Sequence, residues 1–367
     1  MAARIPSLTG IRTVAALSVC LTHAAFWTGH YTDDLAGRLL SRFEIGVAIF
    51  FVLSGYLLFG PWVGALAEDR RMPSVRRYFW HRARRILPAY WLTVIAVYLL
   101  YGFYTPPDAA PTGTGWSGFL RNMTLTQVYG TGHLHSGLTQ MWSLAAEVMF
   151  YLALPVIAYP LIAMCRGRWR PDLLFVGLAS LLLVSPVWSV VVAGSAGLDP
   201  SARLWAPAFF GWFVGGMVLA VTAQLVRRWP ATPSVVVALS AFVISAGSVA
   251  GEPTITPSTA SATIVKHVLY LIAAVALIGP LTVPDQADWW ARLCGSRPMV
   301  WFGEVSYEFF LVHVVVLEIV MDVLGYHVFS GSMPIVFLVT TAVSVPVAWL
   351  LHRVTAPLWR IRTPIAV

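Results

Sequence analysis

The sequence predicts an all-α integral membrane protein, a polytopic bundle of about ten transmembrane helices. Of its 367 residues, 58% are hydrophobic and only 11% are charged, too few polar residues to cover a soluble protein of this size. The apolar residues gather in runs long enough to cross about 30 Å of hydrocarbon. We expect ten helices, at residues 7–28, 43–65, 86–104, 143–164, 173–194, 205–226, 234–251, 263–283, 299–323 and 334–356.

The arginines predict how these helices are oriented. They concentrate in alternate loops, above all in 66–85 and 165–170, and cytoplasmic loops collect positive charge. We therefore expect both termini in the cytoplasm. Arg12 interrupts the first apolar run and no small-residue cleavage site follows it, so this helix is expected to stay as an anchor. No soluble domain, linker or repeat is evident, which predicts one transmembrane domain over residues 1–367.

Charge and ligand patterns exclude two classes of partner. The net charge of +8 sits in short loops rather than on one face of a soluble domain, so it favours anionic lipid headgroups over nucleic acid. Cys20, Cys165 and Cys294 show no paired spacing, and His133 and His135 lack a third ligand, so no metal site is predicted. The segment 105–141 is long for a connection, and we expect it to be partly helical or functional, for example as a lid over the outer mouth.

The first helix carries two ionisable side chains, Arg12 and His23, in an otherwise apolar run. Each costs at least about 2.5 kcal/mol in lipid, which favours a functional role. Eleven residues bring both onto one face, about 16 Å apart along the axis. Arg12 then lies towards the cytoplasm and His23 towards the outside. A lone histidine in a helix more often serves only in packing, so a functional role for His23 requires a partner side chain.

Glu147 supplies a candidate partner at the start of the fourth predicted helix. Ser143, Glu147 and Tyr151 recur every fourth residue and form one polar stripe. Because the fourth helix runs from outside to inside, we expect Glu147 at the depth of His23. A carboxylate that orients an imidazole is the usual arrangement for deprotonating a hydroxyl. The alternative is a polar network that only holds two helices together.

Arginines cluster before the third predicted helix. Arg82, Arg84 and Arg85 directly precede the run from Ile86 to Tyr90. Topology alone explains several such charges, and anionic lipids explain others. Arginines at a helix entrance also bind phosphate through bidentate hydrogen bonds, so a phosphorylated cytosolic donor such as coenzyme A is a further candidate.

The ninth predicted helix adds a second histidine. Ser306 and His313 are seven residues apart and share a face, and Gly303 allows another helix to approach closely one turn earlier. Because this helix runs outwards, His313 is expected near the level of His23. Glu304 and Glu308 lie nearer the cytoplasm, are expected to be either solvated or paired with loop arginines, and are interpreted as structural.

Five ordered motifs carry a family resemblance. They read IPSLTGIR followed by His23, FFVLSGYLL, RARRILPAY, WSLAAEVMFYL and GEVSYEFFLVH. Together they make the chain resemble the acyltransferase-3 family of bacterial integral membrane O-acyltransferases, from about residue 4 to the C-terminus. A C-terminal hydrolase-like domain that some members append is not expected here.

The resemblance implies a reaction and a site. An acyl group, usually acetyl with succinyl as an alternative, would pass from cytosolic acyl-CoA to a hydroxyl of a cell-envelope glycan, a glycolipid or a secreted small molecule. The family's motifs fall on Arg12 and His23, on Glu147, on Arg82 and Arg85, and on Ser306, Tyr307 and His313. We expect His23 to act as general base oriented by Glu147, with a covalent acyl-His23 intermediate left open. The expected substrate or oxyanion contacts are Ser143, Tyr307 and His313, and the expected acyl-CoA contacts are Arg12, Arg82, Arg85 and Tyr90.

The competing interpretation is a transporter or flippase whose polar residues line a path without making bonds. Against this interpretation, the sequence lacks the pairs of interrupted helices, at corresponding positions in two halves, that many transporters show. A membrane scaffold or sensor is a weaker third interpretation. In the enzyme interpretation the protein lies in the bacterial inner membrane, acyl-CoA is its donor substrate and no cofactor is permanently bound.

Overall fold

The computed structural model describes residues 5–255, 259–283 and 286–359, and every regular element in these ranges is helical. Short 3₁₀ turns join the helices, of which η1 (Arg42–Glu44) and η2 (Ser136–Met141) matter below. The helices are α1 (Pro6–Trp27), α2 (Leu35–Ser41), α3 (Ile45–Ala67), α4 (Val75–Phe103), α5 (Gly115–Met123), α6 (Trp142–Met164), α7 (Pro171–Leu182), α8 (Val184–Gly194), α9 (Ala206–Thr222), α10 (Ala231–Ser245), α11 (Ala260–Ile278), α12 (Trp289–Cys294), α13 (Arg297–Val323) and α14 (Met333–Trp359).

The predicted bundle is confirmed, since each of the ten apolar segments is helical. In the described part of the chain, eight helical stretches are long and apolar enough to cross a membrane, with α7 and α8 counted as one. The other two predicted segments are α10, which has 15 residues, and α13, which carries several acidic side chains. The protein is therefore a multi-pass membrane protein.

One predicted helix is broken in the middle. Residues 173–194 form α7 and α8, which meet at Leu183. Pro186 lies in the first turn of α8, where its missing N–H cannot bond back to α7. The prediction of one continuous helix missed this break because it considered hydropathy and not the position of Pro186.

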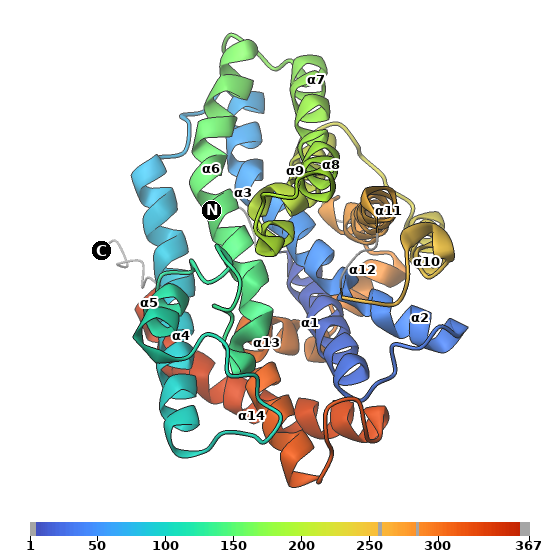
Figure 1. Cartoon of the computed structure of the whole chain (residues 1–367). Helices are drawn as coiled ribbons and strands as arrows, with labels where there is room; N and C mark the ends of the chain where they lie inside the picture. The colour runs from blue at the N-terminus through green and yellow to red at the C-terminus, as the bar shows by residue number, and fades with distance from the viewer. Residues whose placement is uncertain (1–4, 256–258, 284–285, 360–367) are drawn as a thin grey trace.

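α1 lies in the middle of the bundle and packs against α3, α13 and α14 (Figure 1). α10 and α11 lie together on one side of the molecule, and α4 and α5 on the opposite side (Figure 1). Large apolar side chains on α8, α10 and α14 are exposed, among them Val187, Leu239 and Leu350. An apolar outer surface of this kind suits a protein surrounded by lipid.

The two ends of the bundle differ in charge. The arginine-rich end is the one that carries residues 68–74 and 165–170, and the loop end carries 28–34, 104–135 and 324–332. Arg84 Nε donates to Leu358 O at the arginine-rich end (2.6 Å), and Phe329 N donates to Trp27 O at the loop end (2.7 Å). Which end faces the cytoplasm stays a prediction, and residues 1–4 and 360–367 lie outside the described ranges.

α4 begins earlier than predicted, at Val75 rather than at residue 86. Ser74 caps it by accepting a hydrogen bond from Arg77 N, and neither glycine nor proline interrupts the chain before Pro88. The basic segment is consequently helical, and its arginines project from a helix.

The segment 105–141 is partly helical, as predicted, because it contains α5 and η2. Tyr90, in the middle of α4, is fully buried and donates to Asn122 O near the end of α5. Asn122 is fully buried too, and its Nδ2 donates to Gly118 O (2.9 Å). α5 is thereby fastened to the bundle at the loop end.

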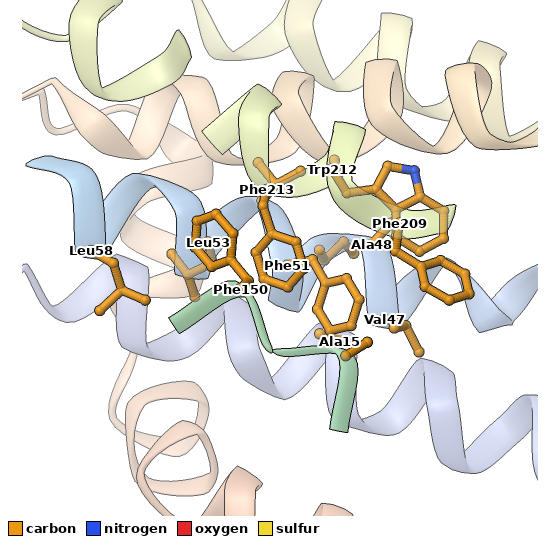
Figure 2. Close-up of a cluster of buried hydrophobic side chains, with 14 of the residues drawn as sticks. Ala15, Val47, Ala48, Phe51, Leu53, Leu58, Phe150, Phe209, Trp212 and Phe213 are labelled. Atoms are coloured by element: carbon orange, nitrogen blue, oxygen red, sulfur yellow. The ribbon is translucent and has the colours of Figure 1, made fainter. Parts of the chain in front are cut away.

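Aromatic packing joins α3, α6 and α9. Phe213 stacks between Phe51 and Phe150, with ring centroids 4.3 and 4.0 Å away (Figure 2). Gly55 and Gly216 let α3 and α9 touch, since a Cβ on Gly55 would lie 2.0 Å from Phe213 O. Small residues at helix contacts are the usual means of close packing in membranes.

A second glycine contact joins α1 to α13, as the sequence predicts for Gly303. A Cβ there would lie 2.0 Å from Thr9 O, so only glycine fits. Thr13 Oγ1 strengthens the contact by donating to Met299 O (2.7 Å). The two helices are therefore held at backbone distance, and this fixes how their two histidines meet.

Candidate active site

His23 and His313 form a direct pair between α1 and α13. His23 Nδ1 lies 2.8 Å from His313 Nε2, and the rings stack with centroids 5.1 Å apart. His313 is fully buried, whereas His23 is half-buried. The expected equal depth of the two histidines is confirmed.

The hydrogen bonds of His313 define which nitrogens carry protons in the neutral pair. His313 Nδ1 lies 2.8 Å from the carbonyl oxygen of Phe310, which can only accept, so Nδ1 is the protonated nitrogen. His313 Nε2 is then an acceptor, and His23 Nδ1–H donates to it. This assignment leaves His23 Nε2 with a free lone pair, which is the form a general base requires.

His23 lines a cavity of about 650 Å³ in the loop-end half of the bundle. Trp142, Trp188, Phe209 and Trp212 supply aromatic walls. Polar groups lie between them, which is the composition expected of a pocket for an amphipathic small molecule. The polar lining side chains include Thr22, Tyr31, Glu44, Gln140, Ser143, Ser189, Arg203, Lys266 and His267.

Glu147 does not orient His23, and this expectation was wrong. Its carboxylate accepts a hydrogen bond from Ser54 of α3. Gln140 Nε2 donates to Leu311 O (2.9 Å), so Gln140 already lies near the level of His313. Glu147 follows seven residues later and lies about 10 Å nearer the arginine-rich end. The error arose because the membrane-spanning stretch begins at Ser136, earlier than its apolar run indicates.

Glu147 belongs instead to a second polar group. Arg12 and Arg82 are close enough to act on its carboxylate electrostatically. Tyr78 Oη, also on the arginine-rich half of α4, donates to Tyr151 O one turn further along α6 (3.1 Å). Two of the predicted donor-binding arginines thus lie within electrostatic range of the predicted catalytic carboxylate.

Arg85 lies in a third group, around Glu308. Its Nη1 is 3.2 Å from Oε1 of Glu308, a fully buried carboxylate that also lies 3.1 Å from Nδ1 of His352. The expected pairing of Glu308 with an arginine is confirmed, and its structural role stays a prediction. The Arg85 guanidinium lies 5.4 Å from the ring centre of Tyr307, whose hydroxyl donates to Ile86 O (3.0 Å). Tyr307 is therefore part of this group and does not line the cavity.

The remaining predicted residues divide between the two halves. Ser143 lines the cavity with His23, and its hydroxyl donates to Gln140 O (3.2 Å). Tyr90 does not meet the arginines, because its hydroxyl is used to hold Asn122. We correct its expected role from donor binding to fastening α5.

Sequence reasoning assigned none of the charged residues of the cavity wall to the site, among them Glu44 and Lys266. Both lie in or beside apolar runs, and Lys266 is buried. The rule that selected Arg12 and His23, an ionisable side chain in an apolar span, would have selected these two as well.

The fold and the site define a polytopic membrane protein with a neutral imidazole pair beside a polar and aromatic cavity. A family model described as an acyltransferase domain matches residues 5–353, nearly the whole chain. The chain therefore belongs to the acyltransferase-3 family.

Curated relatives are similar along most of the chain. Peptidoglycan O-acetyltransferase OatA of Listeria monocytogenes is 25% identical over 87% of this chain and 50% of its own length. Acyltransferase MdmB of Streptomyces mycarofaciens is 29% identical over 86% of this chain and 79% of its own. The putative peptidoglycan O-acetyltransferase YrhL of Bacillus subtilis is 27% identical over 89% of this chain and 51% of its own length. The chain thus spans about half the length of OatA and YrhL. No solved structure matches.

Proposed function

We propose that the protein is a membrane O-acyltransferase that moves an acyl group, acetyl first and succinyl as an alternative, from acyl-CoA to a hydroxyl. The acceptor is a cell-envelope glycan, a glycolipid or a secreted small molecule. The observation that carries the proposal is the His23–His313 pair, which leaves one imidazole nitrogen available as a base on the wall of the cavity. The family and the names of the relatives support the same reaction.

On the acceptor side, His23 Nε2 removes the hydroxyl proton while the oxygen attacks the thioester carbonyl. His313 accepts the hydrogen bond from His23 Nδ1–H, keeps the ring in the correct tautomer and stabilises the imidazolium that forms. The carbon–sulfur bond then breaks and coenzyme A leaves as a thiolate. His23 transfers its proton to this thiolate and becomes neutral again. Ser143 is a candidate donor to the developing oxyanion.

On the donor side, the arginine-rich end supplies the contacts for the coenzyme A phosphates. Arg82 and Arg85 lie in the first half of α4, and Arg12 lies near the start of α1. The eleven residues from Arg12 to His23 correspond to about 16 Å along α1, a distance that the thin pantetheine arm would cross. In this proposal the arginine-rich end faces the cytoplasm of a bacterial cell and the cavity faces outwards.

The test is release of free thiol by the purified protein in lipid nanodiscs. With acetyl-CoA and the base-treated cell envelope of the producing strain, we expect thiol release together with labelled acetyl on the envelope. A transporter or flippase makes no bond and would release no thiol above the empty-nanodisc background. If the folded protein releases thiol only at the rate of empty nanodiscs, the proposed function is overturned.

A further inference from the structure

Lys266 and Glu44 form an ion pair in the wall of the cavity. Lys266 Nζ lies 2.8 Å from Glu44 Oε1, and the Tyr270 hydroxyl donates to the same oxygen (3.1 Å). Both charged residues line the cavity. The carboxylate side chain is 34% exposed, and the lysine side chain 9%. The pair is thus held by protein on one side and open to the cavity on the other.

The pair retains hydrogen-bonding capacity on its open side. Both contacts to Glu44 reach Oε1, which leaves Oε2 able to accept. An ammonium group has three N–H donors, and Glu44 takes one of them. An acceptor and a donor side by side match one hydroxyl group, which donates through hydrogen and accepts through oxygen.

Stability alone gives little reason for this pair. Moving two charges out of water costs several kcal/mol per ion, and apolar residues of similar volume often replace such pairs without loss. Lys266 is also the only lysine in the chain, although Lys and Arg together number 24. A compact ammonium at this position suits a single small oxygen better than the planar fork of arginine does.

The pair is close to His23 along the cavity wall. Thr22, the residue before His23, donates to Leu40 O (3.1 Å), and η1 with Glu44 follows directly along the chain. One acceptor molecule is therefore able to reach both groups.

We propose that Lys266 and Glu44 form a specificity-determining subsite that binds a second hydroxyl of the acceptor, next to the hydroxyl that His23 deprotonates. Glu44 Oε2 accepts from this hydroxyl, and Lys266 donates to its oxygen. The protein then prefers polyhydroxylated acceptors to simple alcohols. The inference rests on the proposed function and adds a residue-level basis for its acceptor choice.

The test measures initial rates of acetyl transfer in Lys266→Met, Glu44→Gln and wild type, with cell envelope and acetyl-CoA varied in turn. Transfer is followed as labelled acetyl on base-treated cell envelope together with release of free thiol. Loss of one charge-assisted hydrogen bond is expected to raise the apparent KM for envelope by about 10-fold to 100-fold in each variant. The kcat at saturating envelope and the KM for acetyl-CoA should stay within about twofold of wild type. The matched control is Arg170→Gln, which breaks an exposed ion pair at the arginine-rich end and should change neither KM value.

The outcomes separate the competing explanations. If Glu44→Gln lowers the KM for envelope while Lys266→Met raises it, the subsite binds an anion, and the hydroxyl assignment is overturned. If both variants lose kcat while the KM for envelope stays at the wild-type value, the pair is structural, and the inference fails. If wild type releases no thiol at all, it is the proposed function that fails.

Discussion

Two polar regions of this bundle are built in opposite ways. The histidine centre is the neutral pair of His23 and His313. His313 is fully buried, and its Nδ1–H donates to the Phe310 carbonyl oxygen. The carboxylate centre is Glu147 with Ser54 and the nearby charges of Arg12 and Arg82. The first contains no formal charge to stabilise at rest, whereas the second balances anion against cations inside a membrane protein.

The difference assigns separate tasks to the two centres. An imidazole acts as a base only in its neutral form, and His313 supports His23 without placing a charged group directly against it. Phosphate groups need positive charge, and Arg12 and Arg82 both lie within electrostatic range of the Glu147 carboxylate. We infer that deprotonation belongs to the histidine centre and donor binding to the carboxylate centre.

The largest expected effect is that of His23→Ala. Removing the base should lower kcat for transfer by at least about 10³-fold, within the 10²–10⁴ that general-base assistance supplies, or more where the ring also positions the acceptor. Labelled acetyl on cell envelope is the measurement. Binding of acetyl-CoA, followed by calorimetry, should be unchanged. A variant with near wild-type transfer would remove His23 from the chemistry.

His313 is tested by a matched pair of substitutions. His313→Gln keeps an oxygen able to accept from His23 Nδ1–H, whereas His313→Leu removes the acceptor. We expect kcat to fall by about 10²-fold in the leucine variant, from the wrong tautomer and an unsupported imidazolium, and clearly less in the glutamine variant. Equal losses in two well-folded variants would assign His313 to packing alone.

Glu147→Gln distinguishes the two centres most directly. If Glu147 positions Arg12 and Arg82 for the donor, the KM for acetyl-CoA should rise by about 10-fold, the value of one charge-assisted interaction, with little change in the KM for cell envelope. Initial rates with each substrate varied in turn provide the measurement. A loss of kcat with both KM values unchanged would return the carboxylate to the chemical step.

The sequence predicted the membrane helices well because a long apolar run is by itself sufficient to indicate a segment that lies in lipid. It also predicted that His23 and His313 share a level, since both positions follow from counting residues along helices of known direction. It misplaced Glu147, because depth depends on where a span begins, and η2 carries the chain into the bundle before the apolar run starts. Partners such as Ser54 depend on which helices are neighbours, and periodicity within one helix carries no such information.

Tyr90 shows the same limit from another side. Its place beside a basic motif suggested donor binding, but a motif is contiguous in sequence and not in space. Five residues after Arg85, the Tyr90 hydroxyl meets Asn122 of α5, a contact between segments 32 residues apart. Only the fold of the segment 105–141 decides that contact.

The smallest expected effect concerns stability at the loop end, where a third histidine is also kept neutral by burial. His135 is 2% exposed and packs against Tyr98 and Tyr101, with ring centroids 4.6 and 4.7 Å away. Burial lowers the pKa of His135 from 6.5 to about 4. Its unfolded form therefore binds a proton at a higher pH than its folded form does.

The sign of the pH dependence follows. Above pH 6.5 the ring is neutral in both states, and as the pH falls from 6.5 towards 4 stability is lost, by at most about 3 kcal/mol. Thermal unfolding of His135→Phe in nanodiscs should show a shallower loss between pH 7 and pH 4.5 than wild type. His327→Gln, at an exposed histidine of the same end, is the control and should follow wild type. Parallel curves for all three proteins would mean that acid acts on other groups, and that neutral burial of an imidazole is a property of the histidine centre rather than of the whole loop end.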